Sequence, residues 1–208
     1  AQEDENQRTL FGHKDKKSKE HVDVGFDAGI KLGYGNIDNR STFDFDFEAG
    51  VVLGHSIEFG GFLDALSTEK YTDKLLEDKL MYNSIYGGLF IKPVAMHQMP
   101  VHLAFPIKIG GGKVEYATAA SRGYYDEDRY YYYENDDYRC EDDCPVFVFE
   151  PGVQLELNFF KKFHISGGVS YKFFNKLDLS YRADNTRIIK KKGLNGFFYG
   201  ITFNFGLF

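Results

Sequence analysis

The chain has 208 residues with 17% aromatic residues, 22 Gly, 5 Pro and no Trp, which is enough for one sizeable domain and favours β-strands. A net charge of −6, without a Lys/Arg stripe interleaved with stacking aromatics, argues against a nucleic-acid-binding protein. No apolar run approaches the roughly 20 residues of a membrane-spanning helix, so a helical membrane protein is excluded.

The first twenty residues are polar and are not expected to form a core of their own. The sequence begins AQEDENQ without Met, which is typical of a mature exported chain after cleavage of a signal peptide. Two adjacent apolar residues, Leu10 and Phe11, interrupt the polar segment. We expect residues 1–20 to be a disordered or docking tail that contacts a partner, or the rim of the domain, through Leu10 and Phe11. Residues 21–208 are expected to form the domain.

From residue 21 onward, apolar and polar side chains alternate in eight segments, which predicts β-strands with one apolar and one polar face. The segment FDFDFEAGVVL, for example, has Phe43, Phe45 and Phe47 on one face and Asp44 and Asp46 on the other. The predicted strands are 21–34, 43–53, 57–65, 82–92, 101–116, 147–159, 163–173 and 194–207.

The connections between these strands alternate in length. Short connections are predicted at 54–56, 93–99 and 160–162, and long ones at 35–42, 66–81, 117–145 and 174–193. Short turns on one side and long loops on the other are typical of outer-membrane barrels. The sequence therefore predicts an all-β, eight-stranded, antiparallel up-and-down transmembrane β-barrel, with short periplasmic turns and long outer loops.

The alternative all-β structure is a soluble eight-stranded barrel that binds an apolar ligand. The interior of eight strands is too narrow for the dozens of large apolar side chains on the apolar faces, so those faces must point outward, into lipid. The polar faces then line the lumen, where acids exceed bases. The inward acids are Asp23, Asp27, Asp44, Asp46, Glu48, Glu58, Glu150 and Glu156, and the bases are Lys31, Lys108 and Lys172, with His102 and His164 available.

The last strand, which closes the sheet against the first and ends in aromatic residues, resembles the last strand of bacterial outer-membrane β-barrels. A more specific resemblance lies in TLFG, HSIEFGGF, YGGLFIKP and PVHLAFPIKIGGG, at 9–12, 55–62, 86–93 and 100–112. Together these blocks are similar to a family of uncharacterised Bacteroidetes outer-membrane barrel proteins, over about the first half of the chain. The resemblance implies a barrel in the bacterial outer membrane and brings no established activity.

The sequence gives little evidence for a catalytic site or a metal site. His164 and Ser166 share the inward face after a short turn, and we interpret them as a polar pair that fills the lumen, not as part of a catalytic triad. Met96, His97, Met99 and His102 are ligand types that suit copper, but no metal-site spacing is present. We therefore predict no catalytic residues, no cofactor and no metal at these positions.

The third outer loop combines tyrosines with acids and is the best candidate for an extracellular binding surface, because Tyr offers large contact area at low entropic cost. Its tyrosines are Tyr124, Tyr125, Tyr130, Tyr131, Tyr132, Tyr133 and Tyr138. Cys140 and Cys144 are predicted to form a disulfide that tightens the loop. The surrounding carboxylates could also bind Ca²⁺, although the regular spacing of a calcium loop is absent.

The sequence leads to the hypothesis of a non-enzymatic outer-membrane barrel that serves as a docking or accessory subunit of an envelope protein complex. Its N-terminal tail would lie in the periplasm and its long loops outside the cell. The alternatives are a lipid-modifying outer-membrane enzyme and a narrow cation channel.

Overall fold

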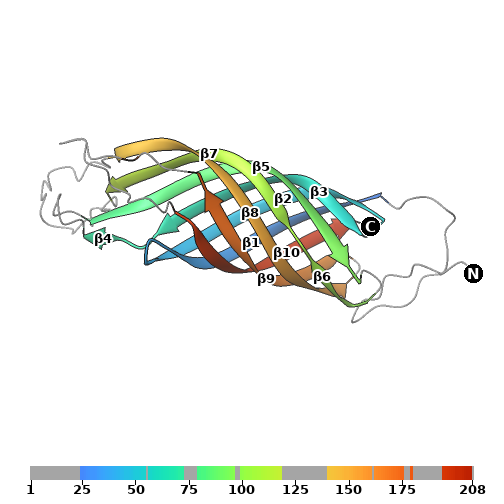
Figure 1. Ribbon diagram of the computed structural model, residues 1–208. Coiled ribbons are helices and arrows are strands. Elements are labelled where there is room, and N and C mark those ends of the chain that lie inside the picture. Colours follow the sequence, from blue (N-terminus) through green and yellow to red (C-terminus); the bar gives the residue numbers. More distant parts are fainter. Residues whose placement is uncertain are drawn as a thin grey trace, which may run out of the picture.

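The structure is a computed structural model, which describes residues 24–54, 56–72, 79–96, 99–118, 140–160, 162–175, 179 and 194–207. Antiparallel strands form one closed, tilted sheet (Figure 1). They are β1 (Val24–Ile37), β2 (Arg40–Leu53), β3 (Ile57–Thr68), β4 (Tyr71–Thr72), β5 (Lys79–Ala95), β6 (Val101–Ala104), β7 (Ile107–Thr118), β8 (Cys140–Phe160), β9 (Phe163–Phe174) and β10 (Gly196–Leu207). The described residues include no helix that is long and apolar enough to cross a membrane.

The ring has eight strand positions, which confirms the predicted barrel. β3 pairs with β5, and β1 pairs with β10, so the sheet closes on itself. β6 and β7 are the two parts of the strand predicted at 101–116, and they are separated at Phe105 and Pro106, where Pro lacks an N–H for the ladder. β4 is a two-residue strand that extends the pairing of β5 at one end of the barrel.

The polarity of the wall is inverted relative to a water-soluble protein. On β2, Phe43, Phe45 and Phe47 are 65%, 50% and 45% exposed, whereas Asp44 and Asp46 are 3% and 0% exposed. Large apolar side chains are exposed in the same way on the other ring strands, and polar or charged side chains are buried on them. The predicted assignment of the two faces is therefore confirmed.

The interior contains aromatic rings as well as the acids and bases expected on the polar faces. The structure adds a cluster of buried aromatic rings, in which Phe62 and Phe174 both pack edge-to-face against Tyr86. Phe62 also lies over Gly110, and Phe90 lies over Gly50, so the inward glycines make room for rings from neighbouring strands.

The connection between β1 and β2 is a tight turn, so the long loop predicted at 35–42 is wrong. Asp38 and Asn39 are its only two residues between the strands, with φ of 51° and 59°. Two successive residues with positive φ form the type of turn whose twist matches a β-hairpin, and Asn and Asp tolerate this conformation better than other non-glycine residues. The short connections predicted at 54–56, 93–99 and 160–162 are present. The strands leave 54–56, 96–100 and 161–162 between them, so the first has the predicted bounds and the other two begin later than predicted.

Strands β5, β7 and β8 extend at the end of the barrel opposite the C-terminus (Figure 1). The pairing of β7 with β8 continues to Ala117 and Cys140, within the segment that the sequence assigned to a loop at 117–145. Cys140 and Cys144 consequently lie along one strand, where four residue steps keep their Cα atoms on the order of 10 Å apart, even with the irregularity beside Ala117. A disulfide needs about 4.4 to 6.8 Å. The structure does not support the predicted disulfide, because the cysteines belong to an extended strand and not to a loop tip.

Gly60 and Gly61 provide a matched test of the packing between β2 and β3. A Cβ atom at Gly60 would collide with the carbonyl oxygen of Ala49, whereas at Gly61 the nearest atom would be the carbonyl oxygen of Gly88, at an ordinary 3.5 Å. We predict that Gly60→Ala lowers the free energy of unfolding by roughly 1–3 kcal/mol, because the neighbouring backbone must move. Gly61→Ala should change it little. Urea unfolding in detergent, followed by gel mobility without boiling, measures the stability of both variants. Equal effects of the two substitutions would contradict the close approach of Gly60 to the backbone of Ala49.

Candidate functional site

The charged groups inside the barrel form the most elaborate polar site of the described residues. β2 contributes Asp44, Asp46 and Glu48 at alternate positions, so all three point inward and are buried. Four buried lysines reach the interior from other strands, namely Lys31 on β1, Lys92 on β5, Lys108 on β7 and Lys172 on β9. Eight buried carboxylates accompany these four lysines, so each amine is shared between several acids.

Lys172 makes the most contacts within this network. Its Nζ donates to Asp44 Oδ1, Asp64 Oδ2 and Tyr86 Oη, each at 2.6 Å. Glu150 Oε2 lies 3.6 Å from the same amine. The partners come from β2, β3, β5 and β8, so one side chain from β9 connects strands on several sides of the interior.

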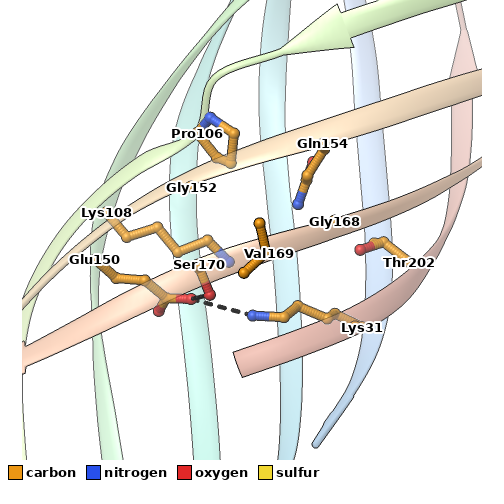
Figure 2. A pocket seen from close by; sticks show the side chains of 11 residues that line it. Lys31, Pro106, Lys108, Glu150, Gly152, Gln154, Gly168, Val169, Ser170 and Thr202 are labelled. Carbon is orange, nitrogen blue, oxygen red and sulfur yellow. Dashed lines mark hydrogen bonds and ion pairs between the residues drawn. The ribbon is translucent and has the colours of Figure 1, made fainter. Parts of the chain in front are cut away.

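Lys31 joins the same carboxylates from β1. Its Nζ lies 3.1 Å from Asp44 Oδ2. The same amine lies 3.1 Å from Glu150 Oε1, as Figure 2 shows. Ser170 Oγ donates to Glu150 Oε1 at 2.6 Å, which fixes this carboxylate further. Beside these groups lies a cavity of about 10 Å³, which is room for roughly one water molecule.

A second group of ion pairs lies next to the first. Lys92 Nζ is 2.5 Å from Glu58 Oε2, 3.5 Å from Glu156 Oε1 and 3.6 Å from Glu48 Oε1. Lys108 Nζ pairs with Asp46 and lies 3.0 Å from Glu48 Oε2. Glu48 is therefore shared by two lysines from β5 and β7. The two groups meet along β2, so the interior is crossed by a nearly continuous network of charges.

The His164 and Ser166 pair does not form a catalytic triad. His164 Nε2 lies 3.4 Å from Asp27 Oδ2, while the buried Ser166 Oγ has no hydrogen-bond partner. A nucleophilic serine needs a hydrogen bond to its base, and this one is enclosed within the barrel. The arrangement agrees with the interpretation of these residues as polar filling of the lumen.

The methionine and histidine residues considered for copper do not converge on one point. His102 is buried, and its Nδ1 lies 2.9 Å from the carbonyl oxygen of Met99, whereas the Met96 and Met99 side chains are exposed. His97 lies outside the described residues. Within the part of the chain that the structure describes, no group of three or more His, Cys, Asp or Glu residues is arranged to hold a metal ion.

Most of the predicted binding residues lie outside the described residues. This holds for Leu10, Phe11 and the tyrosines of the third outer loop, which are Tyr124, Tyr125, Tyr130, Tyr131, Tyr132, Tyr133 and Tyr138. Of the acids considered for Ca²⁺, those between 126 and 137 also lie outside the described residues, whereas Asp142 and Asp143 lie on β8. Asp23, predicted as an inward acid, is likewise outside the described residues. Their roles remain predictions.

The sequence analysis missed two members of the network, Asp64 and Lys92. Both were detectable from side-chain alternation. Asp64 is on the same face of β3 as Glu58, and Lys92 is on the same face of β5 as Tyr86. The signal was weak for Lys92, because both faces of β5 carry large apolar or aromatic residues.

Comparison with known proteins gives a fold and no family. No sequence-family model matches the chain, and no curated protein matches its sequence. Among solved structures, Neisserial surface protein A (NspA) is similar, with a TM-score of 0.52 and 11% identity, over 88% of this chain and 96% of that one. The Yersinia pestis attachment invasion locus protein Ail, in complex with sucrose octasulfate, has a TM-score of 0.45 and 11% identity, over 88% and 97%. The N-terminal β-barrel domain of Pseudomonas aeruginosa OprF has a TM-score of 0.44 and 8% identity, over 88% and 97%.

Lys172 allows a direct test of the network. We predict that Lys172→Met lowers the free energy of unfolding by about 3–5 kcal/mol, because it leaves Asp64 buried without a cation and leaves Asp44 with Lys31 alone. Lys113→Met is the control, since the Lys113–Glu115 pair is exposed and should contribute at most about 1 kcal/mol. Both are measured by urea unfolding in the same detergent. Similar losses in the two variants would show that the interior ion pairs do not hold the barrel together.

Proposed function

We propose that this chain is a non-enzymatic β-barrel of the bacterial outer membrane that serves as a docking or accessory subunit of an envelope protein complex. The observation that carries the membrane location is the inverted wall, with phenylalanines outside and carboxylates inside. An apolar surface of this extent promotes aggregation in water and is stabilised by the hydrocarbon of a bilayer. A closed sheet also pairs its backbone groups internally, as a bilayer requires. In this proposal the apolar outer face of the barrel therefore contacts outer-membrane lipid.

We also propose how the barrel is oriented in the outer membrane and that it comes from a member of the Bacteroidetes. The turns that follow β2, β5 and β8 would face the periplasm, together with the N-terminal tail. The tight turn at Asp38 and Asn39 and the extended ends of β5, β7 and β8 would face outward. The resemblance of the blocks at 55–62, 86–93 and 100–112 to Bacteroidetes outer-membrane barrels supports such an origin. The N-terminal tail at the periplasmic end and the tyrosine-rich loop at the outer end are the parts that we assign to partner binding.

The interior supports a structural role in preference to catalysis or transport. A lipid-modifying enzyme needs a nucleophile and a base that lipid can reach, whereas Ser166 and His164 are enclosed. A cation channel needs a continuous water-filled path. Ion pairs such as Lys172–Asp64 and Lys31–Glu150 join strands across the interior, which argues for a barrel filled by its own side chains.

We predict that the purified protein gives no stable conductance in planar bilayers, because side chains fill the interior of an eight-stranded barrel. Lys172→Met serves as a comparison, since it removes the amine that joins the most strands. Reproducible unitary current steps from the parent protein would favour the channel and contradict a filled interior.

The docking role is tested in the N-terminal segment. Leu10 and Phe11 are adjacent apolar residues in a polar sequence, and short apolar motifs of this kind can bind a pocket on a partner. Burying one Leu and one Phe contributes roughly 3–6 kcal/mol before ordering costs, which is enough to matter within a membrane.

We predict that Leu10→Asp with Phe11→Asp releases a co-purifying envelope protein and leaves the barrel folded. Asn6→Asp with Gln7→Asp is the matched control, because it adds the same charge and keeps both apolar side chains. Gentle detergent extraction, followed by mass spectrometry of the co-purifying proteins, measures the result. If the double variant retains every partner, the tail does not dock, and the tyrosine-rich outer loop becomes the candidate.

A further inference from the structure

Arg40 lies among tyrosine rings at the end of the barrel where β1 and β2 meet. Its Cζ atom is 4.5 Å from the ring centroid of Tyr71, 4.7 Å from that of Tyr82 and 6.0 Å from that of Tyr116. Tyr82 and Tyr116 are buried and pack together with centroids 4.8 Å apart, while Tyr71 on β4 is exposed. We call Arg40 and these three rings the Arg40 cradle. Ring faces attract the cation, but they leave its N–H donors in need of acceptors.

The pairing of Arg40 differs from that of the buried lysines. Lys31, Lys92, Lys108 and Lys172 each contact at least two carboxylates. Arg40, in contrast, forms no ion pair with a carboxylate of the described residues, and its buried Nη1 has no hydrogen-bond partner. A buried donor without an acceptor costs roughly 1–3 kcal/mol. An external acceptor would remove this cost.

The position of Arg40 along the barrel indicates which acceptor is nearby. Phe43 is the last outward-facing aromatic residue of β2 before the turn, and its ring packs edge-to-face on Tyr34. Tyr34 Oη in turn donates to Ser41 Oγ at 3.0 Å, so this pair has an apolar body and a polar end, as aromatic residues at membrane surfaces do. Arg40 lies three residues beyond Phe43, roughly 10 Å along the strand. On the proposed membrane location this is the level of the lipid headgroups, and the Arg40 side chain is on the inward-facing side of β2 that Thr42 and Asp44 share, at the mouth of the barrel.

We propose that the Arg40 cradle binds a phosphate group at the outer end of the barrel. A guanidinium offers two parallel N–H donors that match two oxygens of a phosphate, and the stacked rings hold its plane in a fixed orientation. The exposed Tyr71 forms the side of the cradle that a ligand can reach. The phosphate can belong to a lipid headgroup or be free in solution. The lipid source rests on the proposed membrane location, whereas phosphate binding by itself does not.

The test uses the full chain folded in a phosphate-free, non-ionic detergent, with ¹⁵N-labelled arginine. The side-chain Nε–Hε resonance of Arg40 is assigned by its loss in Arg40→Gln and followed during titration with inorganic phosphate. A second titration uses lipid A in the same detergent, with dephosphorylated lipid A as its control. Lys162→Gln is the matched variant, since it removes an exposed cation next to the turn between β8 and β9.

We expect a saturable shift of the Arg40 resonance, which is retained in Lys162→Gln. Arg40→Lys has no such resonance, so its affinity is compared with that of the parent by isothermal titration calorimetry. We expect Arg40→Lys to bind phosphate about tenfold or more weakly, because it keeps the charge and loses the paired donors. A shift with lipid A alone identifies the headgroup as the source, and a shift with inorganic phosphate shows that the group suffices. Dephosphorylated lipid A should have no effect. If neither phosphate source moves the resonance, the rings alone hold Arg40 and the proposal is wrong.

Failure of this site is distinguishable from failure of the membrane location. The same samples are run on a gel with and without boiling and are reconstituted into lipid vesicles. A folded, vesicle-inserted protein without phosphate binding would refute the cradle alone. A protein that binds inorganic phosphate but does not insert would refute the membrane location alone.

Discussion

The pairing of β1 with β10 is the contact on which the rest of the barrel depends. Ten residue pairs, from Phe26 and Leu207 to Gly35 and Phe198, join the first strand to the last. This closure satisfies the backbone groups of two strands that would otherwise be edges. It also creates the interior, because Lys31 on β1 reaches Glu150 on β8 only when β10 and β9 lie between those strands. The charged network is thus a consequence of closure as well as a support for it.

Inversion of the wall makes the strand register unusually well specified. A shift of β2 by one residue would turn Asp44, Asp46 and Glu48 to the apolar exterior and turn the phenylalanines between them inward. Both changes are unfavourable, because the acids would lose their lysines and the rings would not fit beside Tyr86 and Phe90. Charges inside such a barrel therefore select one arrangement of strands, a role that does not require each ion pair to be strongly stabilising.

Side-chain alternation was sufficient to predict the strands, their two faces and most of the interior acids, because the period of two is a direct property of extended backbone. It failed where local backbone preference or non-local pairing decided the structure. Asp38 and Asn39 form a turn without the glycine that usually marks one, so a hairpin was mistaken for a loop. Cys140 belongs to a strand only because β7 continues beside it, and no pattern around Cys140 itself shows this. Lys92 and Arg40 gain their significance from partners on other strands, which a single sequence does not identify.

The extension of β7 and β8 lowers the entropic cost of ordering the loop that joins them. Because Ala117 and Cys140 are paired, the segment that joins the two strands begins and ends at points about 5 Å apart on a stiff ribbon. Its ends are already held together in the isolated protein, so the binding of a ligand does not have to offset the entropic cost of closing that loop. The paired ends of β7 and β8 also extend beyond the hairpin at Asp38 and Asn39, so the described strands end at different heights around the barrel (Figure 1).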